Sequence, residues 1–159
     1  MMEPSISIVV PAHNEAGNLP EFIKKTASAL KKITRDFEII IIDDGSTDDS
    51  WEYLRQLKTK LPQLKAIRLR RRSGQTAAIM AGFGIAKKEI VVVMDADLQQ
   101  DPEDIKKLIE PIKQGKADVV SGQRQKRHHA LMIRLIAAIE RALNRWTLGV
   151  RLNDTAVSP

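Results

Sequence analysis

Hydrophobic and polar positions follow two alternating periods along this chain of 159 residues. Short runs rich in Ile and Val are followed by stretches in which apolar residues recur at the spacing of one helix face. The runs predict strands at 6–10, 37–42, 65–69, 89–94 and 117–121. The longer stretches predict helices at 18–33, 75–86 and 102–114, and one that carries Trp51, Leu54 and Leu57. Because strands alternate with helices, we expect an α/β domain with a doubly wound, mainly parallel sheet flanked by helices.

The two most apolar runs predict strands inside that sheet. Residues 37–42 are apolar on both faces apart from Glu38, which is typical of a parallel strand covered by helices on both sides. Residues 91–93 are consecutive valines, and this run ends abruptly at Asp95 and Asp97. We therefore expect these carboxylates at the carboxyl end of a buried strand, where open α/β sheets bind their ligands.

Polar side chains follow four of the predicted strands. These strand ends are residues 11–15 (PAHNE), 43–46 (DDGS), 95–97 (DAD) and 122–124 (GQR). Because the carboxyl ends of parallel strands meet at one edge of a sheet, we expect them to converge. One acidic strand end is often a helix cap, but several together are costly unless a cation or a donor-rich ligand binds there.

The best candidate for a metal site lies at the end of the valine run. Asp95, Asp97 and Gln99 occupy alternate positions, so an extended chain can point all three the same way. Hard oxygen donors suit a hexacoordinate Mg²⁺ or Mn²⁺ that keeps positions open for phosphate oxygens. The alternative is that Asp97 or Asp101 only caps the helix after Pro102.

Composition narrows the class of partner. The formal net charge of +6 favours an anionic partner: nucleic acid, acidic lipid or a phosphorylated small molecule. Aromatic residues make up only 4% of the chain, which argues against a protein that stacks single-stranded bases. No glycine-rich phosphate loop follows the first predicted strand, so a metal ion with Arg124 nearby is the expected way to hold phosphates.

The sequence has no cysteine, no start that resembles a signal peptide and no apolar stretch long enough to span a bilayer. We therefore expect a soluble domain in the cytoplasm.

Five motifs follow one another between about residues 6 and 154. They are PAHNE at 11–15, DDGSTD at 43–48, SGQTAA at 73–78 with AG at 81–82, MDADLQ at 94–99 with DPE at 101–103, and SGQR at 121–124. In this order they resemble the motifs of family 2 glycosyltransferases, which have the GT-A fold, a Rossmann-like nucleotide-sugar-binding domain. Within that family the chain is most similar to the branch of dolichol-phosphate mannosyltransferases and bacterial polyprenyl-phosphate glycosyltransferases.

The resemblance implies roles for individual residues. Asp97 and Arg124 match catalytic positions, Arg124 as a contact to phosphate, and Asp95, Asp97 and Gln99 match ligands of a Mg²⁺ or Mn²⁺ that bridges a diphosphate. The positions implied to contact the nucleotide sugar are Pro11, His13, Asn14, Glu15, Ile42, Asp44, Asp95 and Ala96.

The activity implied is metal-dependent, inverting transfer of a sugar from a UDP- or GDP-sugar to an undecaprenyl or dolichyl phosphate, as in the synthesis of cell-envelope glycans. The resemblance places such a protein peripherally at the cytoplasmic face of the membrane, without a nucleic-acid partner, either as a monomer or as a homo-oligomer. Two alternatives stay open: a nucleotide-sugar-binding domain that does not transfer, and a basic nucleic-acid-binding protein.

Several side chains have a simpler structural interpretation. His13 is either a turn residue or a ligand contact, whereas Asp43 and Asp48 are expected to be caps. Residues 70–72, three arginines, form either a solvated basic face or a contact to anionic lipid. Residues 75–82 are small and are expected to pack on the sheet rather than to act in catalysis.

The end of the sequence predicts a second region. We expect a catalytic domain at 1–125 and the start of an acceptor-side region at 126–159, with an amphipathic helix at 130–148 that lies either on a membrane or against protein. Glu140 stands where the family often has a serine near the acceptor phosphate, and residues 156–159 depart from the family's acceptor motif. We expect a truncated chain that binds the donor but transfers weakly or not at all to lipid.

Overall fold

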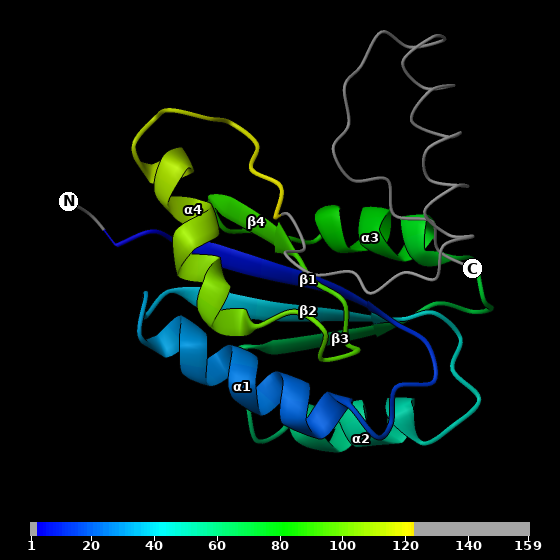
Figure 1. The fold of residues 1–159 in the computed structure, drawn as a ribbon. Helices are drawn as coiled ribbons and strands as arrows, with labels where there is room; N and C mark the ends of the chain where they lie inside the picture. The colour runs from blue at the N-terminus through cyan, green and yellow to red at the C-terminus, as the bar shows by residue number, and fades with distance from the viewer. Residues whose placement is uncertain (1–2, 123–159) are drawn as a thin grey trace, which may run out of the picture. The chain divides into compact units, whose positions relative to one another are not determined.

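One parallel sheet organises the chain in the computed structural model, which describes residues 3–122. Its four strands lie in the order β3-β2-β1-β4 (Figure 1). Their bounds are Ile6–Ala12 for β1, Phe37–Asp43 for β2, Leu64–Arg68 for β3 and Ile90–Val93 for β4. All three pairings are parallel, as the alternation of strands and helices predicted.

Helices cover both faces of this sheet, with α3 on one side and α1 and α2 on the other (Figure 1). The helices are α1 (Leu19–Lys31), α2 (Ser50–Lys58), α3 (Gln75–Phe83) and α4 (Ile105–Lys113), and the short 3-10 helix η1 (Pro102–Asp104) precedes α4. The four helices predicted within residues 3–122 are confirmed, and the three that were predicted with bounds are slightly shorter than expected. None of the helices within residues 3–122 has the length and apolar character needed to cross a bilayer.

Strand β2 lies at the centre of the core, and all of its residues are buried. Its odd-numbered residues, such as Ile39 and Ile41, join the larger core cluster, which includes Phe22 of α1. Its even-numbered residues Ile40 and Ile42 join a smaller cluster beneath α3. The prediction that this strand is covered on both faces is confirmed.

Helix α3 packs very closely on β1. A Cβ atom added to Gly82 would lie 2.3 Å from Cγ1 of Val9, which is itself fully buried. Ala78, one turn earlier, is also fully buried. The small side chains of α3 therefore set the distance between the helix and the sheet. This agrees with the expectation that they pack on the sheet.

Two expectations about the sheet are wrong. Strand β4 lies at the end of the strand order, and Val91 and Val93 are each 40% exposed, so the valine run is buried on one face only. Residues 117–121 form no strand within the described part of the chain, and Val119 is 86% exposed. An apolar run of two valines buries too little area to fix a strand by itself. The compact unit that contains the sheet ends at Val120, and the domain boundary near residue 125 stays a prediction.

A buried polar cluster lies near the amino ends of the strands. The Oε1 atom of Glu38 accepts hydrogen bonds from the Ser7 hydroxyl (2.7 Å) and the Lys87 backbone amide (2.8 Å), and its Oε2 atom pairs with Lys65 Nζ at 2.5 Å. Burial alone would raise the pKa of Glu38. The Lys65 ammonium and the two hydrogen bonds outweigh that effect, so the pKa lies below its ordinary value. Glu38 is therefore held as a carboxylate in the fold.

Replacement of Gly82 by alanine tests the close packing of α3. Alanine normally stabilises a helix interior relative to glycine, but here the added methyl group collides with Val9. We expect Gly82→Ala to lower the free energy of unfolding by about 1–3 kcal/mol, measured by urea denaturation. The matched control is Gly84→Ala at the end of the same helix, where the nearest atom would be 3.5 Å away and the change should stay within about 0.5 kcal/mol. Equal stabilities of the two variants would contradict this packing.

Acidification tests the Glu38 cluster. Because its folded-state pKa is lowered, the carboxylate stabilises the fold above the unfolded-state value of 4.5, and this stabilisation is lost as the pH falls through the folded-state pKa. We expect Glu38→Gln to lower the free energy of unfolding by about 1–3 kcal/mol at neutral pH, with a smaller difference from the unsubstituted chain at about pH 3.5. Urea denaturation at both pH values measures this. Glu52→Gln, on the exposed face of α2, is the control, and a difference for Glu38→Gln that does not shrink in acid would refute the assignment.

Candidate active site

Three polar loops meet at one edge of the sheet. They follow β1, β2 and β4, whose carboxyl ends point the same way because all three strands are parallel. The loops contain residues 13–18, 44–49 and 94–101. The predicted convergence of the strand ends is therefore confirmed for these three. Arg124 and the predicted helix at 130–148 lie outside the described residues, as do Glu140 and the segment 156–159.

Asn14 joins the loop after β1 to the loop after β2. Its backbone has a φ of 57°, a left-handed conformation that asparagine tolerates better than most residues. Its side-chain Oδ1 accepts a hydrogen bond from the Thr47 backbone amide (2.8 Å), and its backbone amide donates to Ser46 Oγ (2.9 Å). Asn14 therefore acts first as a structural link in this edge of the sheet.

Further contacts tighten the same junction. His13 Nδ1 lies 2.8 Å from the backbone oxygen of Asp44, and the Glu15 backbone amide donates to Ser50 Oγ at 2.9 Å. The carboxylate of Asp48 accepts hydrogen bonds from the backbone amides of Ala16 (3.1 Å) and Ser50 (3.0 Å). Burial would raise the pKa of Asp48, but hydrogen bonds from Ser50 and from backbone amides lower it overall. Asp48 thus binds the backbone amide of Ser50, the first residue of α2, and also holds the neighbouring loop, although the N-cap position of α2 is Asp49.

Asp43 is a buried ion-pair partner rather than a cap. Its carboxylate is fully buried, with Oδ2 3.1 Å from Arg68 Nε and Oδ1 accepting from the Ser46 backbone amide at 3.2 Å. Arg68 also donates to the Ser46 backbone oxygen (2.8 Å) and lies over the Trp51 ring at 5.8 Å. The expectation that Asp43 caps a helix is wrong. Its carboxylate pairs instead with Arg68 of β3, a contact that the sequence did not predict.

Asp44 fixes the segment that leads into α3. Its Oδ1 accepts a hydrogen bond from the Ser73 backbone amide (2.6 Å), and its Oδ2 accepts one from the Gly74 amide (2.8 Å). The turn that follows Asp44 also approaches this segment. Gly45 has a φ of 66°, and a Cβ atom there would lie 2.7 Å from the Arg72 backbone nitrogen, so only glycine fits. Asp44 is buried, and its first role is to hold the start of α3 against the end of β2.

Asp95 lies between two side-chain amides. Gln75 Nε2, at the first residue of α3, donates to Asp95 Oδ1 at 2.9 Å, and Gln100 Nε2 donates to Asp95 Oδ2 at 3.2 Å. The sequence assigned packing to residues 75–82, which holds for Ala78 and Gly82 but not for Gln75. No local pattern could reveal this contact, because it depends on where α3 begins above the sheet.

The loop after Asp95 makes a tight turn. Asp97 Oδ1 accepts a hydrogen bond from the Gln99 backbone amide (3.0 Å), and the intervening Leu98 has a φ of 60°. Leu98 packs against the larger core cluster, which compensates for its unfavourable backbone. Asp101 accepts from the Glu103 amide at 3.0 Å and caps η1. Capping is therefore the role of Asp101 and not of Asp97.

The donor atoms of this loop fit a hard divalent cation. Asp95 and Asp97 contribute carboxylates, and Gln99 and Gln100 contribute amide oxygens nearby in the chain. No group of three or more His, Cys, Asp or Glu side chains suited to a metal gathers within residues 3–122. With two carboxylates from this loop, a Mg²⁺ or Mn²⁺ ion would take its other ligands from phosphate and water.

Three of the residues predicted to contact the nucleotide sugar have side chains that are buried or partly buried in the sheet. Ile42 is fully buried in the cluster beneath α3, and Ala96 is buried in the larger core. Pro11 is partly buried in β1, in register with Ile42. These three residues pack within the sheet near its carboxyl edge, whereas the polar side chains described above lie in the loops that follow the strands.

Two proteins solved with nucleotides or a nucleotide sugar have a similar fold. The mannosyltransferase PcManGT from Pyrobaculum calidifontis, solved with GDP-Man and Mn²⁺, is 27% identical with a TM-score of 0.58, over 65% of this chain and 30% of that chain. TarS from S. aureus, solved with UDP, is 24% identical with a TM-score of 0.61, over 77% of this chain and 38% of that chain. The fold of this chain, a parallel sheet with acidic loops at its carboxyl edge, therefore belongs to the GT-A class of glycosyltransferase folds.

The chain belongs to glycosyl transferase family 2, whose family model matches residues 7–131. Among its relatives are undecaprenyl-phosphate 4-deoxy-4-formamido-L-arabinose transferases. Those of Pseudomonas savastanoi pv. phaseolicola and Edwardsiella ictaluri are 40% and 38% identical over 150 residues, or 94% of this chain. The chain spans about half the length of these relatives, 44% and 46% respectively.

Replacement of Asp44 by asparagine tests its structural role. An asparagine amide would face one of the two backbone amides with a donor instead of an acceptor, so one partly buried hydrogen bond is lost. We expect the free energy of unfolding to fall by about 1–3 kcal/mol and hydrogen exchange at the Ser73 and Gly74 amides to accelerate, measured by denaturation and by exchange mass spectrometry. Asp104→Asn, on the exposed surface, is the control. Unchanged exchange at both amides would contradict the role given to Asp44.

Proposed function

We propose that this chain carries the donor site of a glycosyltransferase that moves a sugar from a nucleotide sugar to a polyprenyl phosphate. The observation that carries the proposal is the convergence of the loops after β1, β2 and β4 on one sheet edge, with Asp44 at one end and Asp95 and Asp97 at the other. The family and the undecaprenyl-phosphate transferases among the relatives support the substrate class.

The nucleoside end of the donor belongs, in this proposal, to the loops after β1 and β2. Polar groups of His13, Glu15 and Asp44 lie in these loops, and each carboxylate oxygen of Asp44 has a second lone pair beyond the one used by a backbone amide. Asp44 can therefore accept a donor group of a base or ribose without releasing α3.

The diphosphate end belongs to the loop after β4. Asp95 and Asp97 would hold a Mg²⁺ or Mn²⁺, which supplies positive charge to the diphosphate when it is bound. In the reaction, an oxygen of the acceptor phosphate forms a bond to the anomeric carbon, and the bond from that carbon to the diphosphate breaks with its electron pair. Attack from the opposite side gives inversion. Because the acceptor phosphate is already anionic, the reaction needs no strong base from the protein.

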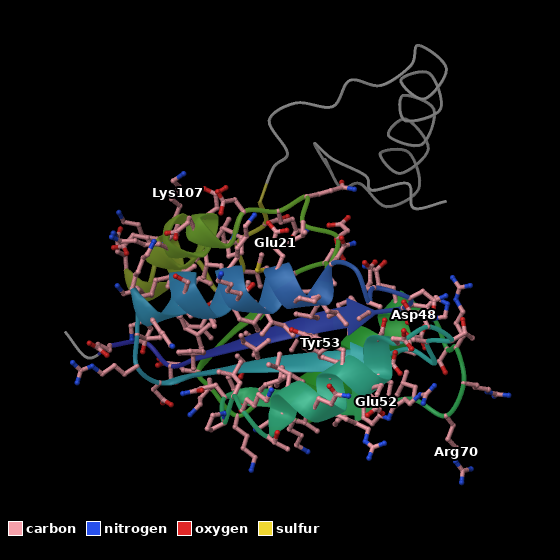
Figure 2. The ribbon with its side chains drawn as sticks, turned by 90° about the horizontal axis from the view of Figure 1, so that it is seen from below. Glu21, Asp48, Glu52, Tyr53, Arg70 and Lys107 are labelled. Carbon is pink, nitrogen blue, oxygen red and sulfur yellow. The ribbon has the colours of Figure 1, made fainter. Side chains whose placement is uncertain are left out.

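A membrane-surface location follows from the lipid acceptor. Residues 70–72, three exposed arginines, lie next to the Asp44 end of the edge, and Figure 2 shows the side chain of Arg70 pointing away from the fold. Basic side chains near a bilayer surface are attracted by anionic lipid headgroups. In this proposal the arginines help to hold the protein at the cytoplasmic face.

Calorimetric titration tests the donor site. UDP-sugars and GDP-sugars are titrated into the chain, first with Mn²⁺ and then with EDTA. We expect metal-dependent binding of one nucleotide class, and we expect Asp97→Ala to weaken it at least about tenfold because a metal ligand is lost. Asp104→Ala, which removes an exposed carboxylate paired with Lys107, should bind as the unsubstituted chain does.

The outcomes separate the candidate functions. Binding that is lost in Asp97→Ala, followed by transfer of labelled sugar to undecaprenyl phosphate, would support the whole proposal. Binding without transfer would favour a donor-binding domain. Absence of nucleotide-sugar binding would refute the proposal, and steeply salt-dependent DNA binding unaffected by Asp97→Ala would favour the nucleic-acid alternative.

A further inference from the structure

We infer that Gln75 is a positioning residue that orients Asp95 for the divalent cation. This inference rests on the proposed function, because it assigns Asp95 to a cation that accompanies the nucleotide sugar. It concerns the hydrogen bond from Gln75 Nε2 to Asp95 Oδ1 at 2.9 Å, which joins α3 to the loop after β4. Gln75 itself is not a ligand in this arrangement, since its amide nitrogen faces the carboxylate.

A hydrogen bond from Gln75 is compatible with a role of Asp95 as a metal ligand. Gln75 donates to Oδ1, and Gln100 donates to Oδ2 at 3.2 Å. A carboxylate oxygen can accept more than one interaction, so the hydrogen bond from Gln75 does not by itself prevent Asp95 from binding a metal ion. Two donors from different directions fix the plane of the carboxylate. A ligand whose orientation is fixed in advance binds a metal more tightly than one that must be ordered on binding.

Gln75 and Gln100 connect Asp95 to different parts of the structure. Gln100 lies five positions along the same loop, so its hydrogen bond moves with that loop. Gln75 belongs to α3, which is held on the sheet by the fully buried Ala78 and by the contact of Gly82 with Val9. Gln75 therefore ties the carboxylate to the rigid sheet and not only to its own loop.

The position of Gln75 is itself set from the other end of the site. Ser73 and Gly74, immediately before it, donate their backbone amides to Asp44 at 2.6 and 2.8 Å. Strands β2 and β4 are not neighbours, because β1 lies between them. The start of α3 therefore bridges from the end of β2 to the loop after β4, and links the nucleoside end to the metal end. A shift of this helix start would alter the orientation of Asp95.

Replacement of Gln75 by methionine is the sharpest test, because methionine has a similar length and volume but no amide donor. Gln56→Met is the matched control, since Gln56 makes the same kind of amide-to-carboxylate bond to Glu52 (3.3 Å) on the exposed surface of α2. A third variant, Gln75→Asn, keeps the amide but shortens the side chain by one methylene group, and it should behave as Gln75→Met does.

The measurement is the affinity for Mn²⁺, read from the electron paramagnetic resonance signal of free Mn²⁺ in the presence of UDP or of GDP. Nucleotide affinity in EDTA and the thermal unfolding midpoint are measured in parallel. We expect Gln75→Met to weaken Mn²⁺ binding about 10–100-fold, the range found when a group that orients a metal ligand is removed. Nucleotide binding in EDTA and the unfolding midpoint should match those of Gln56→Met.

The other possible outcomes overturn either the role of Gln75 alone or the proposed function as well. Mn²⁺ affinity of Gln75→Met within about twofold of the control would overturn the role of Gln75 and leave the proposed function intact. A parallel loss of the unfolding midpoint and of nucleotide binding in EDTA would mean that Gln75 only supports the fold, which also overturns the inference. If the unsubstituted chain itself bound no Mn²⁺ with either nucleotide, the metal-dependent function would fail and the inference with it.

Discussion

The parallel pairing of β1 with β2 is the constraint on which the site depends. The register aligns Ala12 with Asp43, so the two strands end at the same level of the sheet. Asn14 and His13 can then contact the loop after β2 directly, and Glu15 contacts Ser50 at the start of α2. Because β2 is buried on both faces, polar groups that meet solvent or ligand must lie towards its two ends, and those of the candidate site follow its carboxyl end. The hydrophobic core thereby determines where the polar chemistry lies.

Much of this arrangement is predictable from the sequence because its causes are local. Apolar runs gave the four strands of the sheet, and helical spacing gave the four long helices. The acidic strand ends were identifiable because they interrupt apolar runs abruptly, as at Asp43 and Asp95. Parallel connectivity then placed these ends on one edge. The failures are also informative: the segment 117–121 had too few apolar residues to form a strand, and β4 proved to be half exposed.

The partners of individual polar groups were not predictable, because they depend on the strand order and on the height of α3 above the sheet. Asp44 is expected to contact the ligand, and the structure adds a role that the sequence did not indicate, because both of its oxygens hold the backbone before Gln75. Asp43 was expected to act as a cap, yet it pairs with Arg68 of β3. In both cases residue type indicated a polar role, but only the tertiary structure identifies the partner. Sequence patterns report periodicity along one element and carry little information about contacts between elements.

The left-handed backbone at Leu98 has a consequence for the entropy of binding. Such a conformation costs a leucine on the order of 1 kcal/mol or more, and the packing of its side chain on the core offsets that cost. The turn that carries Asp97 is therefore shaped from the core side, not by a ligand. Its conformational entropy is lost when the protein folds, so a ligand that binds there meets a loop that is already ordered. Variation at this position would thus change affinity without altering any group that touches the ligand.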